Sequence, residues 1–345
     1  MRQVELGRSG IRASDWALGT MTYGSQTPEA DAHRQMDMAL EAGVTLWDCA
    51  EVYPTTPQAR ETVGLSEEIL GSWFAARGRR DEVVLATKVG GPGNPNLGER
   101  SYRGGTVRAA CEGSLRRLRT DRIDLYQLHW PERPHYAWRR NWEFAPSGDA
   151  EGALSLMDDV LGQMRDLVAE GKVRAVGLSN ETAWGVLRWR DRGRALGAPV
   201  METVQNEYGL LCRLWDTDMA EVAAMEGVTL LAYSPLASGV LTGKYEGGAV
   251  PEGSRAAILP GIHGRLSPRA GAAVAAYHAL AAEAGMDPVH MALAWHRTRP
   301  FPSVPIFGAT TAAQLGRILG GVEATVGPDL ARRIDEMHRA HPMPY

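Results

Sequence analysis

Short apolar runs alternate along the chain with longer segments in which apolar residues recur at helical spacing. The short runs are rich in β-branched residues and have the length of buried strands. We expect eight strands, at residues 17–20, 44–48, 83–88, 123–129, 173–179, 200–205, 228–233 and 304–307. Helices are expected between them at residues 29–42, 67–77, 107–118, 154–170, 183–194 and 311–319, most of them closed by glycine.

This strict alternation predicts a parallel sheet whose two faces are covered. Eight strand–helix units favour a closed (β/α)8 TIM barrel, because a doubly wound open sheet usually needs fewer. No GxGxxG motif follows an early strand, so a Rossmann domain has no fingerprint here. We therefore expect one barrel domain over residues 1–345, with one extra amphipathic helix at residues 328–341.

Two stretches are longer than a minimal barrel requires. Residues 130–144 are rich in tryptophan, and residues 235–268 are rich in glycine and proline. Both follow predicted strands, so we expect extended loops at the C-terminal face, where barrel active sites are built.

Composition narrows the classes of function. Of the 345 residues, 44% are hydrophobic and 23% are charged, which is typical of a globular protein with a large core. The formal net charge of -4 argues against a nucleic acid partner. No run approaches a membrane span, and the N-terminus lacks the apolar segment of a signal peptide, so a cytoplasmic protein is expected. The three scattered cysteines indicate reduced thiols and no disulfide framework.

Ionisable residues end three successive predicted strands. Asp48, Lys88 and His129 close the second, third and fourth, and Tyr53 follows Asp48 at a distance of five residues. Each alone could belong to a salt bridge at the barrel mouth, but charges inside a barrel are costly unless they are paired. Three such residues beside a tyrosine favour a catalytic site, and no metal site is expected.

The chemistry of this set is that of a proton donor. An adjacent ammonium favours a phenolate, so Lys88 is expected to lower the pKa of Tyr53. Asp48 would keep Lys88 charged, and His129 would hydrogen-bond the oxygen of a substrate. Such a site can protonate a carbonyl that becomes an alcohol, but a cofactor must supply the hydride.

Several motifs closely resemble the aldo-keto reductase family over residues 4–319. They are GTMTYG, DCAEVY, ATKVGG, DLYQLHWP, GKVRAVGLSN, VQNEY and AYSPLASGVLTGKY, in the order of the family. Within the family the pattern is most similar to the bacterial Tas-type members, with potassium channel β subunits as more distant relatives. The resemblance implies a catalytic tetrad at Asp48, Tyr53, Lys88 and His129.

The resemblance also implies NADPH, with NADH less favoured, lying across the barrel mouth. Ser179, Asn180 and Gln205 match residues that bind the nicotinamide carboxamide, and Tyr233 matches the ring that stacks on the nicotinamide. Leu236, Ser238 and Lys244 match the belt over the pyrophosphate. The expected set of cofactor contacts is completed by Thr20, Met21, Asp48, Ser234, Pro235, Arg255, Gly308, Thr310 and Gln314.

The pattern departs from the family at the adenosine end. Arg317 and Ile318 stand where the family has an acid and an asparagine. A 2′-phosphate needs a cation, and the candidates are Arg255 and Arg317.

Tyr23, Trp130 and Trp138 are the expected residues of a pocket for a small carbonyl substrate. Aromatic residues 130–144 would select flat apolar substrates, or would only brace the loop. Arginines in this loop leave open an acidic group on the substrate.

Two alternatives to an NADPH-dependent reductase stay open at this point. One is a regulatory subunit that binds NADPH and senses redox state, although the chain begins almost directly at the opening hairpin of the barrel. The other is a metal-dependent hydrolase using Asp48 and His129, which lacks further ligands at metal spacing. The physiological substrate and the oligomeric state do not follow from the sequence.

Overall fold

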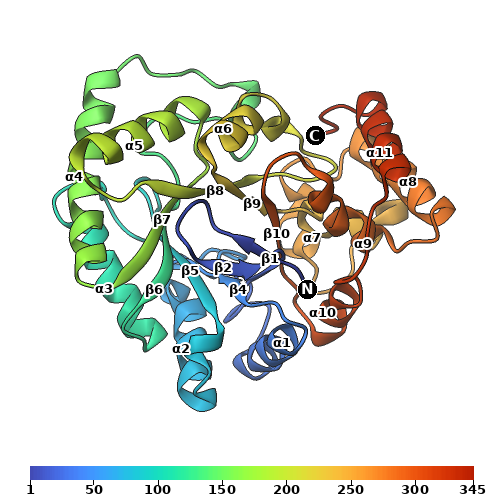
Figure 1. The fold of residues 1–345 in the computed structure, drawn as a ribbon. Helices are drawn as coiled ribbons and strands as arrows, with labels where there is room; N and C mark the ends of the chain where they lie inside the picture. The colour runs from blue at the N-terminus through green and yellow to red at the C-terminus, as the bar shows by residue number, and fades with distance from the viewer.

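Eight parallel strands form a closed barrel at the centre of the computed structural model, which describes residues 1–345 (Figure 1). In chain order these strands are β3 (Ala17–Gly19), β4 (Leu46–Asp48), β5 (Val84–Val89), β6 (Ile123–Leu128), β7 (Val173–Ser179), β8 (Met201–Glu207), β9 (Thr229–Tyr233) and β10 (Ser303–Phe307). Each pairs with its neighbour in the sequence, and β10 pairs with β3 to close the barrel. The predicted (β/α)8 barrel is confirmed, and each predicted apolar run overlaps one of its strands.

Helices surround the barrel and cover the outer faces of its strands (Figure 1). Seven of them each follow one barrel strand in the sequence: α1 (Glu29–Glu41), α2 (Leu65–Arg77), α3 (Thr106–Leu118), α4 (Ala150–Ala169), α5 (Ala183–Leu196), α6 (Asp218–Glu226) and α10 (Ala312–Leu319). Side chains cap the N-termini of α4 and α5, where Asp149 and Thr182 accept from the backbone N–H three residues ahead. Left-handed glycines such as Gly78 and Gly197 end α2 and α5, as the glycine signal predicted.

The connection between β9 and β10 is the longest in the barrel. It contains α7 (Arg255–Ile258), α8 (Pro268–Glu283) and α9 (Pro288–Ala294), and the chain ends after α11 (Pro328–Ala340). The predicted final helix at residues 328–341 is confirmed as α11. In Figure 1, α11 lies beside α8, and the C-terminal end of the chain lies near α6. No helix has the length and apolar character needed to cross a membrane.

A hairpin covers one end of the barrel. Its strands β1 (Gln3–Glu5) and β2 (Arg12–Ser14) are antiparallel. Leu6 and Ile11 from this hairpin are buried with an apolar layer of strand residues that includes Ala17, Leu46, Ala86, Leu125, Ala175, Leu231, Val304 and Ile306. The active site must therefore lie at the opposite end, where the strands finish.

The inner face of the barrel changes from apolar to polar toward that end. Alternate residues of a strand share a face, so the residue two positions after an inward apolar side chain also points inward. After Leu46, Ala86 and Leu125 these inward residues are Asp48, Lys88 and Gln127. All three are buried, so strand periodicity alone places an acid and an amine in the same internal layer.

Candidate active site

Lys88 connects the acid at the end of β4 to the tyrosine that follows it. Its Nζ lies 2.7 Å from Oδ2 of Asp48, 2.7 Å from the backbone oxygen of Cys49 and 3.4 Å from the hydroxyl of Tyr53. The Lys88 side chain is fully buried, and that of Asp48 is 4% exposed. The structure therefore brings together the ammonium, carboxylate and phenol that the sequence predicted.

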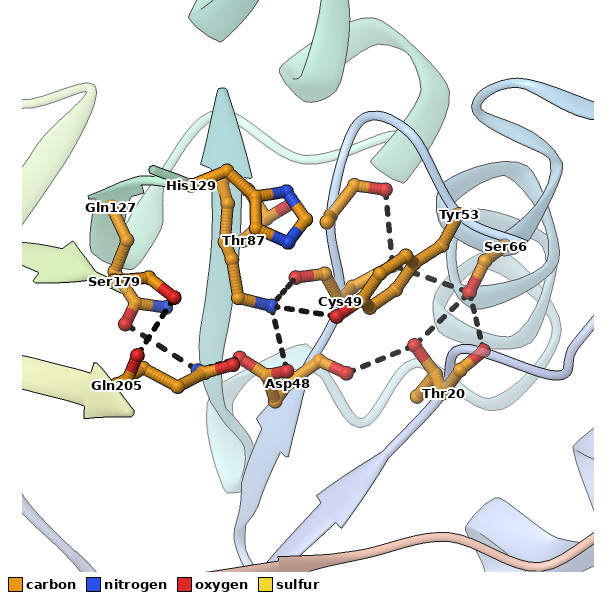
Figure 2. Close-up of polar contacts among 12 residues, drawn as sticks. Thr20, Asp48, Cys49, Tyr53, Ser66, Thr87, Gln127, His129, Ser179 and Gln205 are labelled. Atoms are coloured by element: carbon orange, nitrogen blue, oxygen red, sulfur yellow. Dashed lines mark hydrogen bonds and ion pairs between the residues drawn. The ribbon is translucent and has the colours of Figure 1, made fainter. Parts of the chain in front are cut away.

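Asp48 is held on both of its carboxylate oxygens. While Lys88 occupies Oδ2, the Nε2 of Gln205 donates to Oδ1 at 2.8 Å (Figure 2). The sequence predicted Gln205 only as a cofactor contact and did not predict this bond. Gln205 therefore couples the expected nicotinamide site at the end of β8 to the acid of β4.

Burial, more than charge, determines the proton affinity of Tyr53. Burial raises the pKa of Tyr53, and the Lys88 ammonium opposes this rise without cancelling it. The expected effect of Lys88, which lowers this pKa, is present, but the net shift is upward because the desolvation of a 9% exposed tyrosine outweighs the nearby charge. Burial also tends to lower the pKa of Lys88, but Asp48 and Tyr53 outweigh that effect and raise it. At neutral pH the pair is thus a phenol beside an ammonium.

His129 follows β6 directly and faces Tyr53, with the ring centroids 5.6 Å apart (Figure 2). Burial lowers its pKa well below the ordinary value, and the Lys88 ammonium lowers it further. The ring is therefore neutral at pH 7. Its Nδ1 is buried without a hydrogen-bond partner in the protein.

Thr20 and Cys49 support the backbone around Asp48. The hydroxyl of Thr20 donates to the backbone oxygen of Asp48 at 3.0 Å and contacts the Ser66 hydroxyl at 3.0 Å. Because Thr20 is fully buried, it does not fit the predicted role of a cofactor contact. Burial raises the pKa of the Cys49 thiol to about 12, which suits the predicted packing role. All three cysteines are free and buried.

The residues expected at the nicotinamide form a network at the ends of β7, β8 and β9. The hydroxyl of Ser179 donates to the backbone oxygen of Gln205 at 2.8 Å. Asn180 donates through Nδ2 to the backbone oxygen of His129 at 2.8 Å and to the Ser179 hydroxyl at 3.2 Å. Its Oδ1 accepts from the hydroxyl of Tyr233 at 2.9 Å. Both donors of Asn180 are thus used within the protein, and its side chain ties three strand ends together.

The segment after β9 has the backbone of a tight binding loop. Ser234 and Ser238 have left-handed φ values of 54° and 58°. Pro235 and Leu236 are buried, while Ser238 and Lys244 are partly exposed. Gly239 has a φ of 91°, a backbone conformation that favours glycine.

Arg255 and Arg317, the two candidates for a 2′-phosphate, have different surroundings. Arg317 is paired with Asp287 through two hydrogen bonds of 2.8 and 3.0 Å. Arg255 has no acidic partner and contacts the Ser238 hydroxyl at 3.3 Å. Burial lowers the pKa of Arg255 from its ordinary value. An uncompensated guanidinium beside Ser238 is the better anion site of the two.

The remaining residues expected at the cofactor lie along one edge of the barrel mouth. Met21 is partly buried after β3, and Gly308 is exposed after β10. Gln314 accepts from the backbone N–H of Thr310 at 3.0 Å and lies near its hydroxyl at 3.1 Å. Ile318, which replaces the asparagine of the family, is buried in the core and does not reach this edge.

The three expected substrate-pocket residues differ in their position and burial. Tyr23 is fully buried, and its hydroxyl lies 3.4 Å from Gln35 of α1, so its assignment to the pocket was wrong. Trp130 packs beside His129 with centroids 5.0 Å apart. Trp138 crosses Trp130 at 5.4 Å and is 43% exposed. A row of rings therefore leads from Tyr53 to the surface.

Two ion pairs fasten loop 130–144 to the barrel. Arg133 pairs with buried Glu181 after β7, and Arg139 pairs with Glu207 at the end of β8 at 3.1 Å. Arg133 is neutralised by Glu181, whereas Arg139 shares Glu207 with Arg265, so only Arg133 is clearly removed from the cations that an acidic substrate would need. The two glutamates were not predicted, although each lies two residues beyond a predicted strand and pairs with an arginine of the loop.

The sequence of the chain was compared with known proteins. The model of the aldo/keto reductase family matches residues 16–339. The chain belongs to the aldo/keto reductase family. This aldo/keto reductase is 38% identical to Protein tas of Escherichia coli (strain K12), over 100% of this chain and 99% of that protein.

Two relatives from Bacillus subtilis (strain 168) are also similar to this aldo/keto reductase. The uncharacterized oxidoreductase YrpG is 34% identical over 98% of this chain and 96% of its own length. Aldo-keto reductase YhdN is 30% identical over 91% and 87%. As an aldo/keto reductase, the chain is an NAD(P)H-dependent oxidoreductase that acts on small carbonyl compounds. No three His, Cys, Asp or Glu side chains are grouped in a way that could hold a metal ion.

Proposed function

We propose that the chain reduces aldehydes or ketones to alcohols with NADPH as its cofactor and Tyr53 as the general acid. The observation that carries this proposal is the contact of the buried Lys88 ammonium with Asp48 at 2.7 Å and with the Tyr53 hydroxyl at 3.4 Å. A buried ammonium fixed in this way stabilises a phenolate, which is the species left when Tyr53 gives up its proton.

The chain's own residues would hold and move the proton as follows. Tyr53 is protonated at neutral pH because burial raises its pKa, so it begins in the donating form. As the substrate oxygen takes the proton, Lys88 compensates the charge that develops on the Tyr53 oxygen. Asp48 keeps Lys88 charged and in place. The neutral ring of His129, which makes no hydrogen bond to another residue, is available to orient the substrate oxygen.

The residues around the barrel mouth fit a dinucleotide phosphate. Lys244 and Arg255 both lie in the segment after β9, and neither has an acidic partner within 4 Å. Two unpaired cations in a segment with left-handed backbone, one of them beside the Ser238 hydroxyl, suit the negative charge of phosphate groups. When bound, the reduced nicotinamide supplies the hydride. Tyr233 would flank the nicotinamide, and Gln205 would offer its amide oxygen to the carboxamide.

The substrate pocket is proposed to include Trp130 and Trp138. The indole N–H of Trp130 donates to the backbone oxygen of Pro92 at 2.9 Å, which fixes the ring beside His129. Because the aromatic rings of Trp130 and Trp138 lead from His129 to the surface, we propose flat apolar aldehydes or ketones as the substrate class.

Turnover and binding of the purified chain test the proposal together. Titration with NADPH and NADH, followed by a panel of aldehydes and ketones, should show tighter NADPH binding and carbonyl-dependent NADPH oxidation. The matched variant is Tyr53→Phe, which should bind NADPH within a few fold of wild type and lose about 10²- to 10⁴-fold in turnover. Full turnover in this variant would remove Tyr53 from the mechanism, while NADPH binding without any turnover would favour a redox-sensing subunit.

A further inference from the structure

Three segments that are distant in the sequence meet at Glu207, at the C-terminal end of β8. They are loop 130–144, the segment 235–268 and the residues after α11. Each contributes one side chain to Glu207: Arg139, Arg265 and Tyr345. We call these four residues the Glu207 cluster.

The contacts of the Glu207 cluster are close and mostly buried. The Oε1 of Glu207 lies 3.1 Å from Nη2 of Arg139, 2.6 Å from Nη2 of Arg265 and 3.3 Å from the Tyr345 hydroxyl. The side chains of Glu207, Arg139 and Arg265 are 11%, 14% and 7% exposed. Arg139 also donates to the backbone oxygen of His263 at 3.1 Å, which links the first two segments directly.

Charge balance gives the ring of Tyr345 a role in the cluster. Two guanidinium groups share one carboxylate, so the cluster would carry excess positive charge in a poorly solvated place. The guanidinium carbons of Arg139 and Arg265 lie 4.3 and 5.4 Å from the centre of the Tyr345 ring. The electron-rich face of an aromatic ring stabilises a cation at such distances. The ring of Tyr345 thus stabilises positive charge that the single carboxylate of Glu207 does not neutralise.

The backbone is unfavourable in all three segments where they meet. Five of the ten non-glycine residues with left-handed φ lie there: Trp138, Arg139, Ile262, His263 and Met343. For β-branched Ile262, with φ of 44°, this conformation is especially costly. Such conformations persist only where surrounding contacts hold them, so they point to a function for the contacts.

The Glu207 cluster adjoins the proposed nicotinamide site. Glu207 is the register partner of Tyr233 in the barrel. The Arg265 segment is continuous with Ser238, Lys244 and Arg255, which were proposed above to cover the phosphates. A contact that holds this segment therefore also holds the cover of the cofactor.

We propose that Tyr345 is a positioning residue that holds loop 130–144 and segment 235–268 over the barrel mouth through Arg139 and Arg265. Its ring slows the release of the cofactor and keeps Trp138 in place against the substrate. The part that concerns cofactor and substrate rests on the proposed function. The part that concerns the two loops rests on the contacts alone.

The test compares Tyr345→Ala with Tyr345→Phe, which keeps the ring and loses only the hydroxyl. His341→Ala is the control, since His341 lies in the same segment and its side chain has no hydrogen bond or ion pair with the cluster. NADPH release is followed by stopped-flow protein fluorescence, single-turnover reduction is measured with a small aliphatic aldehyde, and amide hydrogen exchange is measured at residues 130–144 and 255–265.

We expect Tyr345→Ala to release NADPH about tenfold faster, the factor for the loss of a largely desolvated cation–π contact. Exchange in both loops should rise, while the single-turnover rate stays within about twofold, because the chemistry at Tyr53 does not involve Tyr345. Tyr345→Phe and His341→Ala should behave as wild type.

Unchanged NADPH release and unchanged exchange in Tyr345→Ala would overturn the proposal. Equal losses in the Phe and Ala variants would overturn it as well, because the ring would then not be the part that acts. If wild type does not bind NADPH, the proposed function fails, and hydrogen exchange in the two loops alone decides whether Tyr345 holds them.

Discussion

Replacing Lys88 by methionine should separate what this residue does for stability from what it does for chemistry. Methionine has a similar length and no charge, so the space in the barrel stays filled. The change removes three contacts at once, to Asp48, to the backbone oxygen of Cys49 and to Tyr53. The carboxylate of Asp48 would remain buried with a single donor, the Nε2 of Gln205.

The size of both effects follows from these contacts. Removing one partner of a buried ion pair typically costs about 3 to 5 kcal/mol of the free energy of unfolding, and the remaining Gln205 bond places Lys88→Met near the lower figure. Turnover should fall by about 10²- to 10⁴-fold, because Tyr53 loses the cation that offsets the effect of burial on its pKa. Denaturant unfolding measures the first effect, and single-turnover reduction at saturating NADPH measures the second.

A second buried pair provides the control. Arg117 of α3 lies 2.7 Å from Glu67 of α2, whose side chain is fully buried outside the barrel. Arg117→Met should lose stability to a similar extent and keep its turnover. The double variant Lys88→Met with Asp48→Asn should regain stability and stay inactive. Turnover near wild type in Lys88→Met would refute the reasoning, and so would a double variant less stable than Lys88→Met.

The remaining predictions concern pH, the cofactor and the substrate. Because the pKa of Tyr53 is raised and that of His129 is lowered, reductive turnover should be flat across neutral pH and fall above about pH 10, where tyrosine ordinarily titrates; an optimum near pH 7 in the pH–rate profile would contradict this. Arg255→Ala should weaken NADPH binding about 10- to 150-fold more than NADH binding, from the loss of about 1.5 to 3 kcal/mol, and equal losses in fluorescence titrations would exclude a contact with the 2′-phosphate. Trp138→Ala should raise the Michaelis constant for a bulky aromatic aldehyde and leave that for a small aliphatic one unchanged, whereas a lower melting temperature with equal losses for both would make Trp138 a brace. Burial lowers the pKa of His296 to about 3, so the unfolded chain binds more protons than the folded chain below pH 6.5. The free energy of unfolding should therefore fall by up to about 1.4 kcal/mol per pH unit from pH 6.5 to pH 3. Urea titrations should show a shallower dependence of the free energy of unfolding on pH for His296→Asn.

The barrel was predictable because its signal is local. Each strand is a short apolar run whose length and position show in the sequence, and strand order follows from the rule that parallel neighbours are joined by helices. The helices between β9 and β10 were harder to predict. Segment 235–268 consists of 3₁₀ turns and one short helix, whose geometry depends on contacts with the rest of the mouth.

The catalytic residues were also predictable from a local signal in the sequence. Asp48, Lys88 and His129 stand at strand ends, and strand ends of a barrel converge at one place. The burial of the Thr20 and Tyr23 side chains was not predictable, because the loop after β3 directs them inward and no local sequence pattern indicates that direction. The direction of the pKa of Tyr53 also required the burial of the site, which sequence spacing does not reveal.

The least predictable contacts join residues far apart in the chain. Tyr345 and Glu207 are 138 positions apart, and neither the spacing nor the residue types indicate that they meet. Gln205 and Asp48 are 157 positions apart. Such contacts depend on how loops fold over the mouth, which is set by packing in three dimensions.

The bond between Gln205 and Asp48 also fixes the polarity of the amide. An ionised carboxylate only accepts hydrogen bonds, so the amino group of Gln205 must face Asp48 at 2.8 Å, and its second N–H lies toward Gln127 Oε1 at 3.5 Å. Only the carbonyl oxygen of Gln205 remains for a ligand. A pyridine ring bearing an amide can donate to that oxygen, whereas one bearing a carboxylate would place negative charge against it. The same acid that keeps Lys88 charged would therefore let the protein distinguish a nicotinamide dinucleotide from its deamidated nicotinic acid analogue.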